Sequence, residues 1–334
     1  MTVPTEDLRQ ARTIYRELED LGYDRAFSFE AKHDPFVPLA VAGEHTSRIE
    51  LGTAVAIAFA RTPMTLANVA WDLQTVTGGR FVLGLGSQIR PHVEQRFSMP
   101  WDPPVGRMRE LVLGIRAIWR AWETGEPLAF EGEHYTHTRM IPAFDPGPNP
   151  FGAPRILTAG VGPQMTEVAG EVADGLIVHP FNNIPFLEQA ALPAVRRGLA
   201  KAGRERGDFT LQLNAMVITG ESEQAMAAAT QSVKGLLGFY ASTPAYRPPM
   251  EAIGRGDLQP ELNRLSKAGK WQELGEHIDD DFLEAFTTRG APEEIAGKLL
   301  AKYGQHADRL AIYAPYAAPD GMWKKIVEGL KRER

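Results

Sequence analysis

The chain has 334 residues, of which 43% are hydrophobic and 23% charged, a composition typical of a globular protein with a large core. Its formal net charge of −6 argues against nucleic acid or an anionic membrane surface as a partner. Cysteine is absent, which excludes disulfides, thiolate metal sites and cysteine nucleophiles. The N-terminus has no apolar signal core, and the apolar stretch 54–60 is too short to span a bilayer, so we expect a cytoplasmic enzyme.

Apolar runs alternate with amphipathic segments along the whole chain. A first helix is expected between a cap at Thr5 and a stop at Gly22. Strands are predicted at 25–29, 49–57, 81–85, 155–159, 176–179, 209–219 and 309–313. Helices are predicted at 36–45, 63–76, 104–122, 163–173, 185–203, 224–240 and 292–303, and a charged helix closes the chain.

This alternation predicts a parallel sheet covered by helices. With about seven strands in 334 residues, an α/β fold of the (β/α)8 TIM barrel type is favoured over an open doubly wound sheet. The first strand is short or missing, because only residues 1–3 precede the first helix. Either that strand is vestigial or the sequence begins downstream of the ancestral start.

We expect a single domain over 1–334 with insertions near 87–103, 124–154 and 239–290. The alternation in 127–141 predicts a β-hairpin, and the prolines and glycines of 241–290 predict short helices.

Two glycines end the strand in RFVLGLGSQIRP, residues 80–91. Gly84 and Gly86 indicate either tight packing against a neighbouring strand or the close approach of a ligand. A dinucleotide fingerprint is excluded, because Ile89 stands where the third glycine belongs and no helix follows at once.

A second glycine pair follows the strand 155–159. Gly160 and Gly162 precede Pro163, a residue favoured at the first position of a helix. This pattern is typical of an ordinary strand–helix turn, and equally of an anion site at a helix N-terminus. Because the next strand ends in His179 rather than in an acid, a phosphate group fits better than a whole dinucleotide.

Glu30 follows the strand 25–29, where a barrel carries its catalytic residues. It is either a catalytic carboxylate or a solvated loop residue, while His33 and Asp34 are expected to set the turn and cap the next helix. The histidines lack ligand spacing, so no metal is predicted. The chain also lacks the Gly-x-Ser-x-Gly elbow of many serine hydrolases and the strand-end lysine of an aldolase.

Three strings together resemble the bacterial luciferase-like monooxygenase superfamily, and within it the branch that uses the deazaflavin coenzyme F420. They are TSRIELGTAV (46–55), RTPMTLANVAWDLQTVTGGRFVLGLGSQ (61–88), and AGVGP followed by VADGLIVHP. The resemblance covers nearly the whole chain. It implies a TIM barrel with insertions, a flavin or deazaflavin at the C-terminal mouth, and a homodimer.

The resemblance also implies roles for individual residues. It places a non-prolyl cis peptide at Ala54–Val55, behind the cofactor ring. Further cofactor contacts are expected at Ser87, at the phosphate-binding turn and at a strand end near the same tail (Gly160, Val161, Gly162 and His179). Relatives place a histidine or an acid in the region of Glu30, and they often have a glycine and an acid where this chain has Gln88 and Ile89.

The expected activity is that of an F420-dependent oxidoreductase, which transfers a hydride between C5 of the deazaflavin and an organic substrate. Glu30 or His33 would act as general acid or base. The segments 87–103 and 239–290 would form the walls of the substrate pocket. Two alternatives stay open: a monooxygenase that uses reduced FMN and oxygen, and a non-catalytic F420-binding protein.

Overall fold

The computed structural model describes residues 2–3, 7–318 and 321–332, so the predicted cap at Thr5 lies outside the described residues. The chain divides into two compact units. The first comprises the chain up to 159 with 167–176 and 197–209, and the second comprises 160–166, 177–196 and the chain from 210 onward. Three elements cross this division: α5 (Pro163–Val172), β9 (Gly175–Val178) and α7 (Leu192–Lys201).

The first unit is built on parallel strands. They pair in the order β1 (Thr2–Val3), β2 (Arg25–Ser28), β3 (Glu50–Thr53), β5 (Phe81–Gly86) and β8 (Arg155–Ala159), and β4 (Ala56–Ile57) also pairs with β5. All residues of β2 and of β5 are buried, as expected for parallel strands that are covered on both faces. β1 has only two residues, which confirms the short first strand.

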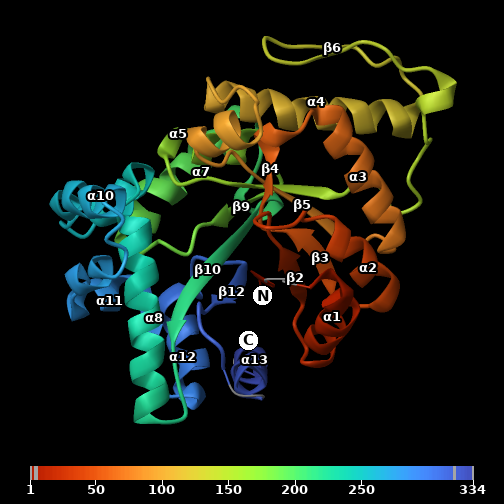
Figure 1. The fold of residues 1–334 in the computed structure, drawn as a ribbon. Helices are drawn as coiled ribbons and strands as arrows, with labels where there is room; N and C mark the ends of the chain where they lie inside the picture. The colour runs from red at the N-terminus through yellow and green to blue at the C-terminus, as the bar shows by residue number, and fades with distance from the viewer. Residues whose placement is uncertain (1, 4–6, 319–320, 333–334) are drawn as a thin grey trace. The chain divides into compact units, whose positions relative to one another are not determined.

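Four long helices accompany this sheet: α1 (Ala11–Asp20), α2 (Val37–His45), α3 (Pro63–Val76) and α4 (Pro104–Thr124). α3 begins at the predicted proline, after the Thr62 side chain accepts a hydrogen bond from Thr65 N–H. α4 ends at Gly125, whose φ of 70° is the left-handed conformation that favours glycine at a helix end. α3 and α4 lie side by side in this unit (Figure 1). Between them, Trp71 of α3 packs on Trp119 and Trp122 of α4, with ring centroids 6.0 and 5.4 Å apart.

The predicted hairpin is present as β6 (Phe130–Glu131) and β7 (Thr136–His137), which pair antiparallel. Glu110 of α4 anchors it, because the carboxylate accepts hydrogen bonds from three consecutive main-chain N–H groups, those of Glu133, His134 and Tyr135.

The second unit is centred on β10 (Thr210–Ile218), which pairs in parallel with β11 (Thr287–Arg289) and β12 (Arg309–Tyr313). Its long helices are α8 (Glu223–Ala241), α12 (Pro292–Tyr303) and α13 (Met322–Arg332). The predicted short helices occur as α9 (Arg247–Glu251), α10 (Gln259–Lys267) and α11 (Asp280–Phe286), and α6 (Ile184–Phe186) follows β9. Phe181, Phe282 and Phe286 pack together in the core of this unit.

Two predictions of strand extent need correction. The expected strand 49–57 is interrupted at 54–55, so that β3 and β4 are separate elements. The strand β11 was not expected, because its three residues lie in a segment for which only helices were predicted. The single-domain organisation with its three insertions stays a prediction.

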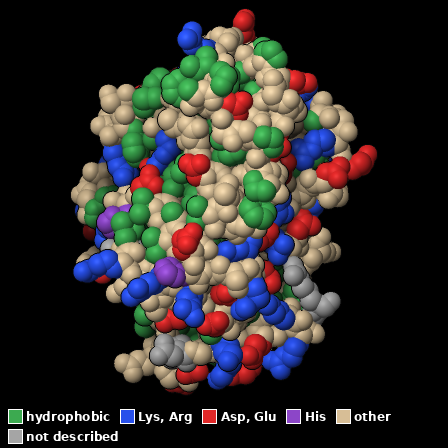
Figure 2. Space-filling model, turned by 90° about the vertical axis from the view of Figure 1, so that its right-hand side faces the viewer, with side chains coloured by type: hydrophobic (Ala, Val, Ile, Leu, Met, Phe, Trp, Pro, Cys, Tyr) green, Lys and Arg blue, Asp and Glu red, His purple; other side chains and the backbone are tan. Residues whose placement is uncertain are grey.

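On the face of the molecule in Figure 2, acidic and basic side chains lie interspersed. None of the described helices combines the length and apolarity that crossing a bilayer requires.

Candidate functional site

The residues predicted to form the site fall into two groups, one on each unit. Glu30, His33, Ala54, Val55 and Ser87 belong to the first unit, at or just beyond the ends of β2, β3 and β5. The turn 160–162 and His179 belong to the second unit.

The break between β3 and β4 is the centre of the first group. The peptide bond between Ala54 and Val55 is cis, as the resemblance implies. Ala54 N–H donates to Ser28 O at 2.7 Å, and Val55 O accepts from Glu30 N–H at 3.1 Å. The two residues of the break are therefore bonded to the last residue of β2 and to the loop that follows it.

Thr53, the last residue of β3, faces Gly84 of β5. Its hydroxyl donates to Gly84 O at 2.6 Å and accepts from Gly84 N–H at 2.9 Å. Gly86, two residues further on, has Val55 against it: a Cβ built on Gly86 would lie 2.6 Å from Val55 Cγ2. The tight-packing interpretation of the glycine pair therefore accounts for Gly86. Ser87 follows, half-buried, at the start of the loop 87–103.

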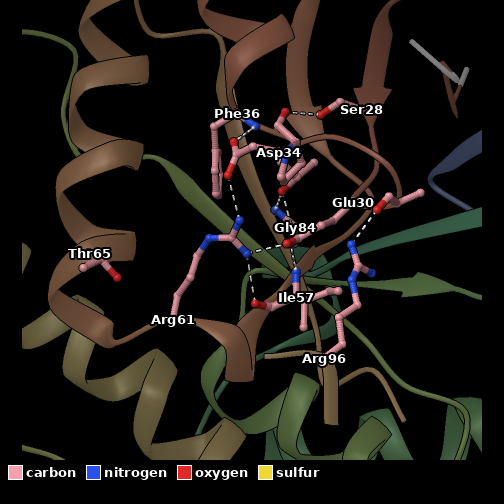
Figure 3. A network of polar contacts seen from close by, with 12 residues as sticks. Ser28, Glu30, Asp34, Phe36, Ile57, Arg61, Thr65, Gly84 and Arg96 are labelled. Atoms are coloured by element: carbon pink, nitrogen blue, oxygen red, sulfur yellow. Dashed lines mark hydrogen bonds and ion pairs between the residues drawn. The ribbon is translucent and has the colours of Figure 1, made fainter. Parts of the chain in front are cut away.

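Glu30 belongs to a network of charged side chains (Figure 3). Its Oε2 accepts from Ile57 N–H at 2.8 Å and from Arg61 Nη1 at 2.6 Å. Arg61 also donates to Ile57 O at 3.2 Å and to Asp34 Oδ2 at 2.8 Å. The carboxylate side chain of Glu30 is 6% exposed and the guanidinium side chain of Arg61 17% exposed, so the pair is largely removed from water.

The charge state of Arg61 follows from these contacts. Burial lowers the pKa of Arg61, but the hydrogen bonds and charges of Glu30 and Asp34 raise it, and the net effect is upward. The guanidinium also lies over the Phe36 ring, 5.2 Å from its centroid. Arg61 therefore stays positively charged at any working pH.

His33 and Asp34 occupy the exposed part of the loop after β2. Asp34 Oδ1 accepts from Phe36 N–H at 2.8 Å, which confirms that Asp34 sets the turn before α2. The expected cap by His33 or Asp34 is wrong, because the N-cap of α2 is Phe36 and no side chain bonds to it as a cap. His33 is exposed, and its catalytic role stays a prediction.

The loop 87–103 is held at both ends by its own residues. Trp101 Nε1 donates to Gln88 O at 3.1 Å, and Arg90 forms an ion pair with Asp102 while lying over the Trp101 ring. Arg96 reaches out of the loop and donates to Ala31 O at 2.6 Å. The loop after β2 and the loop after β5 are thus joined next to Glu30.

In the second group, the turn 160–162 leads directly into α5. The first hydrogen bond of the helix runs from Thr166 N–H to Gly162 O at 3.0 Å, so the N–H groups just before Thr166 have no partner within the helix. A Cβ on Gly162 would meet nothing within 4 Å, whereas one on Gly160 would lie 3.2 Å from Thr166 N. The turn is close-packed behind Gly160 and open at Gly162.

His179 follows β9 and lies among aromatic rings. Tyr246 stacks on it at 4.5 Å and Tyr240 meets it edge-on at 4.7 Å, both between ring centroids. Burial lowers the pKa of His179 to about 3, which keeps the imidazole neutral. Nδ1 accepts from Phe181 N–H at 3.1 Å, so the ring proton of the neutral form sits on Nε2.

Two buried amides lie beside His179. Asn182 Nδ2 donates to His179 O and to Asn214 O, and Asn214 Nδ2 donates to Val178 O. Among the described residues, the two Oδ1 atoms have no hydrogen-bond partner, although Asn182 is 1% and Asn214 6% exposed. Unpartnered buried acceptors are uncommon and indicate that a polar group belongs beside them.

One further cluster could hold a metal by distance alone. Within the described ranges, Glu110, Glu133 and His134 bring their ligand atoms within 4.8 Å of one another. The oxygens of Glu110 already accept three main-chain N–H groups, so this cluster is the anchor of the hairpin.

Several residues of these groups were not predicted: Arg61, Arg96, Asn182 and Asn214. For Arg61 the sequence did contain a signal, because it is the first charged residue after the apolar run 54–60. Glu30 stands in the same relation to the run 26–29. Two opposite charges that each end a buried run are candidates for an ion pair at one edge of a parallel sheet.

Comparison with known proteins gives the family. The model for luciferase-like monooxygenases matches residues 1–309. The chain belongs to this family. An uncharacterized protein of Mycobacterium tuberculosis (strain ATCC 25618 / H37Rv) is 52% identical over 309 residues, which are 92% of this chain and 91% of that protein.

Two further proteins, one similar in sequence and one in structure, depend on coenzyme F420. An F420-dependent glucose-6-phosphate dehydrogenase of Intrasporangium calvum is 32% identical over 208 residues, covering 57% of this chain and 60% of that protein. The structure of the coenzyme F420-dependent tetrahydromethanopterin reductase from Methanopyrus kandleri matches with a TM-score of 0.78 at 19% identity, covering 98% of this chain and 96% of the other. These similarities confirm the α/β fold of the luciferase-like TIM barrel type.

Proposed function

We propose that the protein is an F420-dependent oxidoreductase that transfers a hydride between the deazaflavin C5 and an organic substrate. The observation that carries the proposal is the open turn at the N-terminus of α5, where the N–H groups before Thr166 have no helical partner. A helix N-terminus of this kind suits the phosphate of a flavin-like cofactor. The F420 dependence of family relatives supports the same choice.

The residues present fit such a cofactor. The main chain of Gly160, Val161 and Gly162 would hold the phosphate, and the neutral His179 would offer its Nε2–H to the same tail. Ala54 and Val55 would support the ring, and Ser87 would contact it. When bound, F420 supplies a carbon that accepts or donates a hydride; the protein supplies the binding, the orientation and a proton.

His33 is the residue that we propose for proton transfer. It is exposed on the loop that follows the C-terminal end of β2, the end of a barrel strand where catalytic residues lie. Glu30, the other predicted acid or base, accepts hydrogen bonds from Ile57 and Arg61 with the same oxygen. A carboxylate in that position is suited to holding the chain rather than to exchanging protons.

Cofactor binding tests the proposal most directly. Purified protein is titrated with F420 and, separately, with FMN, and the quenching of cofactor fluorescence is measured. We expect F420 to bind and the variant G162D to weaken it by about tenfold or more, roughly 1.4 kcal/mol, because its carboxylate would face the phosphate. G207D is the matched control, since a Cβ at Gly207 also meets nothing within 4 Å.

The competing functions give different results in the same titration. Tight binding of FMN without binding of F420 would overturn the proposal in favour of a flavin monooxygenase. Binding of F420 without turnover of any of a panel of alcohols, sugar phosphates and enones would favour a non-catalytic F420-binding protein. The predicted homodimer and the cytoplasmic location are separate proposals, and light scattering of the purified protein tests the first.

A further inference from the structure

We propose that Glu30 and Arg61 are a pair of positioning residues that fix the segment 54–57, on which the cofactor ring is expected to lie. This inference rests on the proposed function for the identity of the cofactor. It assigns Glu30 a role other than acid–base chemistry and gives a role to Arg61, which was not among the predicted site residues.

Glu30 bonds to the segment 54–57 at two points. Its main-chain N–H donates to Val55 O, and its carboxylate accepts from Ile57 N–H. Arg61 bonds to the same segment through Nη1, the atom that also binds Glu30, by donating to Ile57 O at 3.2 Å. Both main-chain polar groups of Ile57 are therefore bonded to this one ion pair (Figure 3).

Asp34 and Phe36 in turn fix Arg61. Asp34 Oδ2 accepts from Arg61 Nη2 at 2.8 Å while its Oδ1 accepts from Phe36 N–H, and the Phe36 ring lies under the guanidinium. Because a planar guanidinium makes several hydrogen bonds in fixed directions, it holds Glu30 and Asp34 in one arrangement. The segment 54–57 is thereby joined to the beginning of α2.

The chain offers a matched control at the opposite end of the same strands. Arg25 of β2 and Glu50 of β3 form an ion pair at 2.6 Å, the distance found for Arg61 and Glu30. Arg25 and Glu50 are partners in the β2–β3 register and lie at the start of their strands, away from the segment 54–57. Glu50 also forms an ion pair with Arg155 of β8, so E50Q weakens two ion pairs between strands and tests the general effect of losing such contacts.

The experiment compares the wild type with E30Q, R61K, R61Q, E30Q/R61Q and E50Q. Hydrogen exchange of the cofactor-free proteins is measured over peptides that cover 54–61. The visible absorption spectrum of bound F420 and its dissociation constant are then measured by titration. Thermal unfolding confirms that each variant is folded, and R61K tests whether charge alone is sufficient without the planar guanidinium.

We expect R61Q and E30Q to speed exchange at Val55–Ile57 and to raise the dissociation constant of F420 by about tenfold or more, because small displacements at a binding platform have large effects. The absorption spectrum of bound F420 should change in the same variants. The double variant should be no worse than either single one, since both act through one pair. E50Q should lower the melting temperature without changing the spectrum.

Unchanged exchange over 54–61 in R61Q and E30Q would overturn the proposal. So would a change in the F420 spectrum in E50Q as large as in R61Q, because the effect would then come from general destabilisation. If the wild type does not bind F420 while R61Q still speeds exchange, the proposed function fails. In that case the pair holds the segment for the structure alone, and its role toward the cofactor is refuted.

Discussion

The side chain of Val55 occupies the space that a side chain on Gly86 would need, because a Cβ on Gly86 would lie 2.6 Å from Val55 Cγ2. The two residues belong to neighbouring parts of one sheet, since Ile57 of β4 pairs with Gly86 of β5. The glycine therefore allows the segment after β3 to lie directly against β5.

Substituting G86A should destabilise the protein by about 1–3 kcal/mol, because a branched, rotamer-restricted valine cannot move aside freely. Urea unfolding followed by circular dichroism measures this. G235A is the control, because Gly235 lies inside α8 and a Cβ there would meet nothing within 4 Å. Alanine at this position should raise the free energy of unfolding by up to about 1 kcal/mol. An unchanged free energy of unfolding in G86A would contradict the proposed steric conflict with Val55. A V55A/G86A double variant that is no more stable than G86A would contradict it as well.

Lowering the pH should reduce the free energy of unfolding, because His179 is neutral in the folded protein. Burial lowers the pKa of His179 to about 3, while the unfolded chain titrates near 6.5, so the unfolded state binds the extra proton between these values. Stability is unaffected by this group above about pH 6.5 and should fall by up to about 2 kcal/mol by pH 5.

The measurement for His179 is a series of urea unfolding curves between pH 7.5 and 5 for the wild type and H179Q. The variant should be less stable at pH 7.5, since it loses the stacking on Tyr246, but its stability should fall less on acidification. If the free energy of unfolding falls equally with pH in the two proteins, His179 is not kept neutral by burial.

Replacing Glu110 by glutamine should loosen the hairpin. The carboxylate accepts from Glu133, His134 and Tyr135, and hydrogen bonds to a charged group contribute about 1.5–3 kcal/mol each when intact. Hydrogen exchange over 130–137 should speed up in E110Q and stay near the wild-type rate in E133Q, whose side chain is exposed. Equal protection in both variants would refute the anchoring role.

Lys302 should stabilise the C-terminal end of α11 by capping its carbonyl groups. Its Nζ donates to Glu284 O, Ala285 O and Thr287 O, at 2.8, 3.3 and 2.7 Å, which satisfies carbonyls that the helix leaves open. K302M should cost about 1–3 kcal/mol of unfolding free energy, measured by urea unfolding. The control is K298M, because Lys298 is an exposed residue of α12, the helix that also carries Lys302. K298M should cost less than half as much unfolding free energy, and a reversed order would refute the capping role.

Much of the fold could be predicted from local pattern. α3, β8, α12 and β12 have the predicted bounds, because prolines mark the helix starts and continuous apolar runs mark the buried strands. β11 was missed because its three residues, two threonines and an arginine, have no apolar run; pairing with β10 alone defines it.

The candidate site was less accessible to sequence reasoning. Glu30 could be found from its place after a strand, but its partner Arg61 is 31 residues away and only the register of β2 with β3 brings the two together. The neighbour of Gly86 was likewise hidden, because the glycine indicates a close approach without naming what approaches. Pairwise tertiary contacts of this kind have no local periodicity.

The loop 87–103 is closed at its base by its own side chains, through Trp101 and Gln88 and through Arg90 and Asp102. Arg96 bonds to Ala31, outside the loop, whereas Gln88, Arg90 and Trp101 bond to groups within it. The loop can therefore be replaced as one unit by the corresponding loop of another protein. Grafting the corresponding loop of a relative between Gln88 and Trp101 would redesign one wall of the expected substrate pocket while leaving β5 and α4 as they are.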